Sequence, residues 1–254
     1  MDFVFIIILG GLWGSFANVC IYRLPQNKKG LVSGRSYCPK CKKKIFWYDN
    51  IPIISYLFLS GKCRKCKKQI SSLYLLVEFL SIIVFVSIYY LYGISLTTLL
   101  LIILSLSFII IFFIDLKHFI IPNILTFSMM VLGFVKSFLP NLNPIFPNYI
   151  NSFIGGLFGY GIIWSIIFFY KQIRKKEGMG LGDAKLLAVI GFWFGWVSIP
   201  FVIFLSSTIA LIVVIPDLLK KSKKLTSQIP FGPYLIIATI IFIVFKDTFL
   251  NILL

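Results

Sequence analysis

Two aspartates lie at the edges of long apolar segments, where a membrane protein rarely tolerates a charge. Asp115 follows the apolar run that ends at 114, and Asp183 follows glycines at 178, 180 and 182. A carboxyl group at membrane depth is costly and usually marks a functional site. If the two groups meet, they share a proton, because neighbouring carboxylates cannot both ionise at low cost. One carboxylate can then activate water while the protonated one polarises a peptide carbonyl. The pair therefore predicts an aspartyl protease dyad.

The residues around Asp183 fit close approach of a substrate backbone. Gly180 and Gly182 carry no side chain and leave the chain conformationally free. The aspartate itself opens an apolar segment, and a carboxylate at a helix N-terminus is stabilised by free N–H groups. A plain N-cap is therefore an alternative role for Asp183. Lys185 follows two residues later and either acts on the dyad or points to phosphate headgroups.

Membrane helices must position these residues. The chain has 254 residues and is 59% hydrophobic, which is unlike a soluble domain. Its apolar runs are about membrane length, and backbone polar groups in lipid are satisfied within helices. A closed β-barrel is excluded, because its strands are shorter and alternate in polarity. We expect an all-α polytopic membrane protein with about eight transmembrane helices, near residues 3–22, 73–92, 95–114, 119–139, 150–170, 184–197, 199–216 and 231–250.

The charge distribution predicts how these helices cross the membrane. The net charge is +17, and 13 of the 25 Lys and Arg residues lie in the loop 23–72. With eight spans the other basic loops fall on the same side, whereas the loops near 93, 140–149 and 195–200 carry no charge. The positive-inside rule then places the basic loops in the cytoplasm and both termini outside. Anionic lipid headgroups explain the excess charge more simply than nucleic acid, which is not expected as a partner.

The loop 23–72 contains two CxxC pairs, Cys38 with Cys41 and Cys63 with Cys66, separated by 21 residues. Two such pairs are typical of a zinc ribbon, because each turn presents two thiolates and two turns complete a tetrahedron. Disulfides are the alternative, and the reducing cytoplasm disfavours them. Four protein ligands leave no open position, so the metal is expected to be structural.

Two regions follow from this organisation. Residues 1–72 hold one span and the cysteine loop, and residues 73–254 hold seven spans with short connections. Within the second region, four glycines lie at 155, 156, 159 and 161. Small residues allow membrane helices to approach closely, so we expect these glycines to serve helix packing.

The chain resembles the type IV prepilin peptidases, membrane aspartyl proteases of the GxGD type that mature pilins and pilin-like subunits. The segments that carry the resemblance are Gly14-Ser15-Phe16-Ala17-Asn18-Val19, the two CxxC pairs, Asn50-Ile51-Pro52, Tyr74 with Glu78, Asp115 with Ile121-Pro122-Asn123, Gly180-Leu181-Gly182-Asp183-Ala184-Lys185, and Pro230-Phe231-Gly232-Pro233. The ordered set covers nearly the whole chain. Asn123 departs from the pattern, since relatives often have Asp there.

The resemblance implies two activities at the bacterial cytoplasmic (inner) membrane. Relatives cut the basic leader of a prepilin after a glycine, using the aspartates that match Asp115 and Asp183. Many then methylate the new N-terminus with S-adenosylmethionine, an activity associated with the region that holds the cysteine loop. Glu78 matches a family position and is our candidate for methyl transfer; the alternative is an interfacial acid paired with a lysine. The implied partners are a prepilin and the pilus, secretion or competence machinery.

Three other readings remain open from the residues alone. Another GxGD protease would cleave a free transmembrane helix inside the bilayer. An ion-coupled transporter would use the membrane aspartates to bind cations. A non-enzymatic scaffold of a secretion machine would lack catalytic activity. None of the three accounts for the four-cysteine loop together with both aspartate motifs.

Overall fold

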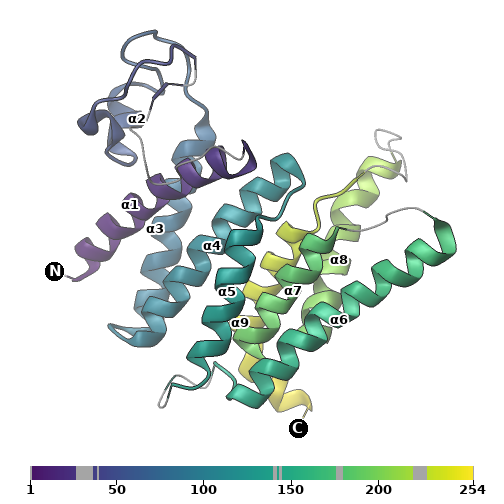
Figure 1. The fold of residues 1–254 in the computed structure, drawn as a ribbon. Coiled ribbons are helices and arrows are strands. Elements are labelled where there is room, and N and C mark those ends of the chain that lie inside the picture. Colours follow the sequence, from purple (N-terminus) through teal and green to yellow (C-terminus); the bar gives the residue numbers. More distant parts are fainter. Residues whose placement is uncertain are drawn as a thin grey trace. The chain divides into compact units, whose positions relative to one another are not determined.

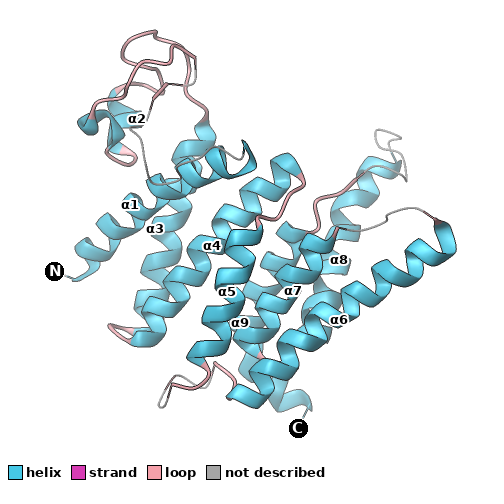
Figure 2. Ribbon diagram, viewed as in Figure 1, coloured by secondary structure: helices cyan, strands magenta, loops and turns pink. Residues whose placement is uncertain are grey.

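The computed structural model describes residues 2–26, 37–38, 40–139, 142, 145–175, 180–219 and 228–253, excepting the side chains of 47, 217–219 and 247–253. The described chain is helical and has no β-strand (Figure 2). The longer helices are α1 (Asp2–Arg23), α3 (Ser72–Tyr92), α4 (Leu96–His118), α5 (Asn123–Lys136), α6 (Tyr149–Arg174), α7 (Leu181–Phe194), α8 (Ser198–Leu219) and α9 (Gly232–Leu253), and a short α2 spans Ile54–Phe58 (Figure 1).

These eight longer helices coincide with the eight predicted spans. Within the described residues, five are long and apolar enough to cross a membrane, namely α1, α3, α4, α6 and α8. The fourth predicted span, 119–139, is shorter in the structure, where α5 has 14 residues. It shortens because Phe119 takes a positive φ of 56° after α4 and Pro122 caps α5 in an extended conformation. The all-α membrane architecture is confirmed.

The chain forms two compact units, residues 1–110 and 111–254, with the division inside α4. In the first unit α1 packs against α3. A Cβ added at Gly10 or Gly14 would lie 2.8 Å from the Cα atom of Ile82 or Glu78, respectively. The two helices can approach this closely only because glycine presents no side chain at the crossing.

In the second unit α7 is the central helix, and it contacts α5, α6, α8 and α9 (Figure 1). Leu186, Leu187, Ile190 and Trp193 of α7 are fully buried. The indole Nε1 of Trp193 donates a hydrogen bond of 2.8 Å to the carbonyl oxygen of Met129 in α5. This bond fixes the position of α7 along α5, and both helices begin at the same end of the unit.

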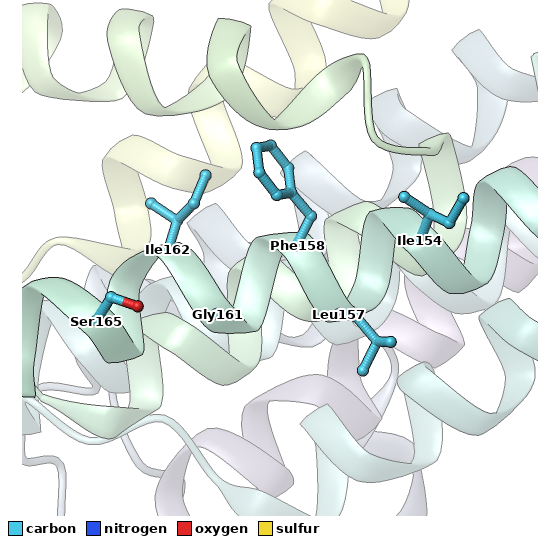
Figure 3. A pocket seen from close by; sticks show the side chains of 6 residues that line it. All are labelled: Ile154, Leu157, Phe158, Gly161, Ile162 and Ser165. Atoms are coloured by element: carbon cyan, nitrogen blue, oxygen red, sulfur yellow. The ribbon is translucent and has the colours of Figure 1, made fainter.

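Helix α6 has one face of glycines against α7 and another face that is open. A Cβ added at Gly155, Gly156 or Gly159 would clash with α7 or the residues that follow it, whereas one at Gly161 would meet none of the described residues within 4 Å. The packing prediction is therefore confirmed for the first three and wrong for Gly161. Gly161 lies in a shallow groove on the open face of α6, lined by Ile154, Leu157, Phe158, Gly161, Ile162 and Ser165 (Figure 3).

Candidate active site and cysteine cluster

Asp115 lies in the last turn of α4 and is only 4% exposed. Its Oδ2 atom accepts a hydrogen bond of 2.9 Å from the backbone N–H of Gly232, the first residue of α9. A Cβ at position 232 would lie 2.7 Å from that oxygen. Only glycine lets the amide approach a buried carboxylate this closely, so the start of α9 is part of the aspartate site.

Asp183 lies in the first turn of α7 and is 9% exposed. The helix begins at Leu181, and its N-cap residue is Gly180 in an extended conformation without a side-chain cap. Asp183 is therefore not the N-cap, and the plain capping role considered for it is wrong. Its own backbone N–H donates to the carbonyl oxygen of Gly180, at 3.2 Å.

The structure brings Asp115 and Asp183 to the same end of the second unit, within electrostatic range of each other. Ile121 lies beside both sites, because its side chain comes close to where an added Cβ would lie on Gly182 and on Gly232. A Cβ at Gly182 would lie 3.0 Å from Cβ of Ile121. Four separate segments of the chain thus converge here: the end of α4, the 119–122 connection, and the starts of α7 and α9.

Lys185 is turned toward α5. Its Nζ atom donates a hydrogen bond of 2.8 Å to Oδ1 of Asn123 and lies 5.5 Å from the ring centre of Phe127. This bond ties the first turn of α7 to the first turn of α5. It therefore links the segment that carries Asp183 to the connection that follows Asp115.

The Sγ atoms of Cys38, Cys41, Cys63 and Cys66 all lie within 4.8 Å of one another. The Cys38 and Cys66 sulfurs are 3.9 Å apart, close to the roughly 3.8 Å expected between thiolates on a tetrahedral zinc ion. None of these four cysteines forms a disulfide in the described part of the chain, which argues against the disulfide alternative. The four cysteines are positioned to bind a metal ion.

The two CxxC turns have matching backbone structure. In each, the first cysteine accepts an N–H from the residue four positions on and donates its own N–H to the carbonyl five positions on. Lys42 and Lys67, which follow the second cysteines, both have a φ of 56°. The backbone N–H of Cys66, with a smaller contribution from that of Lys65, lowers the pKa of Cys63 to about 7. A lowered pKa favours the thiolate, which is the metal-binding form.

Glu78 in α3 is 8% exposed and accepts a 2.8 Å hydrogen bond from the backbone N–H of Ile53. Glu78 also lies against α1, where an added Cβ at Gly14 would be 2.8 Å from its Cα atom, and Ser15 and Asn18 of α1 lie near its carboxylate. Among the described residues Glu78 forms no ion pair with a lysine. Three segments that the sequence presented as separate motifs meet at this carboxylate.

Sequence reasoning missed two features of these sites. The Gly232 amide was part of a noted motif, but its contact with Asp115 spans 117 residues of sequence. Lys136 in α5 was passed over although it is fully buried. Its Nζ donates to the carbonyl oxygen of Trp193, at 3.2 Å, and lies 4.1 Å from the ring centre of Phe146. The available signal was a charge within an apolar segment.

Comparison with known proteins matches both parts of the chain to protein families. A family model described as Bacterial Peptidase A24 N-terminal domain matches residues 8–92, and a model described as Type IV leader peptidase family matches residues 100–215. Glu78 and the four cysteines fall in the first range, and both aspartates fall in the second. No solved structure is significantly similar to the chain.

Several curated proteins are similar over nearly their whole length. A prepilin leader peptidase/N-methyltransferase of Vibrio cholerae is 37% identical, over 95% of this chain and 97% of its own length. Proteins of the same description from Pseudomonas aeruginosa and Dichelobacter nodosus are 34% identical, over 95% and 89% of this chain and 89% and 85% of their own lengths. Together with the apolar helices, these relatives show that the chain is an integral membrane protein.

Proposed function

This chain belongs to the type IV leader peptidase family, and we propose that it removes the leader peptide of prepilins and pilin-like proteins after a glycine. The observation that carries the proposal is the buried pair of aspartates at one end of the second unit. The relatives' shared description as prepilin leader peptidase supports the same reaction.

In the proposed mechanism Asp115 and Asp183 share one proton. The ionised carboxylate takes a proton from a water molecule, which attacks the scissile carbonyl carbon, while the protonated carboxyl donates a hydrogen bond to the carbonyl oxygen. The C–N bond then breaks, and the carboxyl that took the proton from water gives it to the leaving amine. The N–H of Gly232 holds one oxygen of Asp115 in a fixed direction. The other oxygen is then left for the water molecule.

The glycines before Asp183 would provide room for the substrate backbone. A Cβ at Gly180 would find its nearest neighbours only at 3.8 Å, so there is space beside this residue. Gly182 is packed against Ile121 instead. We assign Gly180 to backbone approach, Gly182 to the close packing that brings the two motifs together, and Lys185 to holding α7 against Asn123.

The second proposed activity is N-methylation of the mature N-terminus with S-adenosylmethionine, as the relatives' description implies. We place it in the N-terminal region 1–72 with Glu78, and leave the peptidase in 73–254. The four cysteines fit zinc, because four thiolates at tetrahedral spacing suit that ion and leave no open position. When bound, the metal would hold the loop together and take no part in the chemistry.

The basic loops and the aspartate end of the second unit are proposed to face the bacterial cytoplasm, with both termini outside. The positive-inside pattern supports this orientation. Anionic headgroups would then lie beside the basic loops. The process served is pilus assembly, secretion or competence, since the substrates of such enzymes are pilins and pilin-like proteins.

Mass spectrometry of a co-expressed prepilin tests both activities. Asp115→Asn and Asp183→Asn should each leave the leader attached, because the loss of one catalytic carboxyl lowers the rate by roughly 10²–10⁴-fold. Glu78→Gln is the matched control for a buried acid elsewhere in the chain. It should preserve leader removal and reduce the product that has gained the mass of one methylene group.

The outcomes separate the two assignments. Processing by both aspartate variants would overturn the protease dyad. Full methylation by Glu78→Gln would remove Glu78 from methyl transfer without affecting the dyad. Loss of leader removal in Glu78→Gln would contradict the assignment of Glu78 to methyl transfer alone.

A further inference from the structure

The short helix α2 in the cysteine loop has one anchored face and one exposed apolar face. Ser55 is buried and its hydroxyl donates to the carbonyl oxygen of Tyr48, at 2.7 Å. On the other face Ile54, Leu57 and Phe58 are 52%, 64% and 85% exposed. Three neighbouring apolar side chains left uncovered by their own unit indicate a surface that something else covers.

The segment before α2 reaches back along the membrane helices. Pro52 contacts Gly11 of α1, where an added Cβ would lie 3.2 Å from Cβ of Pro52. The N–H of Ile53 donates to Glu78, the seventh residue of α3. At 1.5 Å per residue, Glu78 lies roughly 9 Å beyond the first residue of α3 along its axis. Because α2 starts at the next residue, it begins near that level of α3, a helix long and apolar enough to span a membrane.

Basic residues follow this segment closely along the chain. Lys62, Arg64 and Lys65 follow α2 within seven residues and are exposed. The backbone N–H of Lys62 bonds to the carbonyl oxygen of Leu59, which folds Lys62 back toward the end of α2. Interfacial membrane anchors combine an exposed apolar face, which enters roughly 5–10 Å into the boundary of headgroups and acyl chains, with neighbouring cations. The segment from Ile54 to Lys65 has both features.

We propose that α2 is an interfacial anchor, in which Ile54, Leu57 and Phe58 insert at the boundary of headgroups and acyl chains and Lys62 contacts lipid phosphate. The anchor holds the four-cysteine module against the bilayer at a third point, besides its connections to α1 and α3. This proposal requires only that α1 and α3 span the membrane, and it stands whether or not the chain is a peptidase. The rival occupant of the same face is the apolar segment of a substrate protein.

Photocrosslinking of the full-length protein in lipid nanodiscs tests the anchor. Phe58 is replaced by p-benzoylphenylalanine, a larger aromatic residue that an 85% exposed position can accommodate, and Lys43 in the same loop is replaced as the matched control. Retention of bound metal shows that the loop is folded in both variants. Irradiation in nanodiscs of phosphatidylcholine and phosphatidylglycerol should yield lipid adducts at position 58 and none at position 43.

Charge dependence provides a second readout. Raising the phosphatidylglycerol content should increase the adduct yield at position 58, and Lys62→Gln should reduce that increase by about fivefold, the effect of one lysine near an anionic surface. Equal lipid adducts at positions 43 and 58 would overturn the anchor. The anchor would also be overturned if position 58 crosslinked only to a co-expressed prepilin and never to lipid. That result would identify the substrate as the occupant of this face.

Discussion

The crossing of α6 and α7 makes a quantitative prediction. At Gly155 an alanine Cβ would lie 2.5 Å from the carbonyl oxygen of Gly191, against at least 3.4 Å for an ordinary contact. The neighbouring atom is backbone and cannot rotate away, so the helices would have to separate by roughly 0.9 Å. Gly161 lies on the same helix with nothing within 4 Å of its added Cβ. Gly161→Ala is therefore a matched control.

The two substitutions share one effect and differ in the other. Each replaces glycine by alanine inside a helix, which favours the helix by up to ~1 kcal/mol. Only Gly155→Ala overfills a packed interface, which typically costs about 1–3 kcal/mol. The helix term cancels in the comparison, so Gly155→Ala should be less stable than Gly161→Ala by about 1–3 kcal/mol.

Unfolding in detergent micelles, followed by circular dichroism, measures this difference. Leader removal should also fall in Gly155→Ala, because α7 carries Asp183 at its first turn and an ångström of displacement can lower a rate by about 10²-fold. Gly161→Ala should keep the full rate. If the two variants unfold alike and cleave alike, the close backbone contact between α6 and α7 does not exist as described.

Three further predictions rest on other contacts. Lys136→Glu should lower the unfolding free energy by about 3 kcal/mol or more, because a buried carboxylate would face the carbonyl oxygen of Trp193. Lys136→Met should still fold, and thermal unfolding compares the two variants. Trp193→Phe should cost about 1 kcal/mol by removing the hydrogen bond from the indole to the carbonyl oxygen of Met129, seen as a lower melting temperature; an unchanged value would contradict that bond. Cys63→Ser should reduce the metal content per chain measured by plasma mass spectrometry, and a full complement of metal would contradict the four-thiolate site.

Much of the fold could be predicted because membrane helices have a strong signal in sequence. Runs of about 20 apolar residues locate the spans, since the backbone in lipid has no partner outside its own helix. The four-cysteine cluster could be predicted from the two CxxC pairs, because the two ligands of each turn are close neighbours in sequence. Asp115 and Asp183 could be predicted to act together because each lies in a segment that resembles a known aspartate motif.

The open face of α6 and the interfacial helix α2 could not be predicted in this way. A span that faces lipid on one side and protein on the other is apolar all round, so its sequence does not reveal which side packs. Four glycines of α6 therefore looked equivalent, although three contact α7 or the chain just beyond it and Gly161 does not. The short α2 lies between basic stretches, and nothing in its order of residues indicates that it reaches back to Gly11 and Glu78.

The sequence by itself predicted the order of the apolar helices, the clustering of four cysteines that could bind a metal ion, and the residues proposed to bear the chemistry. Only the tertiary structure decided that the amide of Gly232 holds Asp115, and that the amide of Ile53 holds Glu78. The physical reason is that each contact joins a backbone N–H to a carboxylate far away in sequence. A backbone amide is present at nearly every residue, so its partner depends on how the helices pack and leaves no mark in the pattern of side chains.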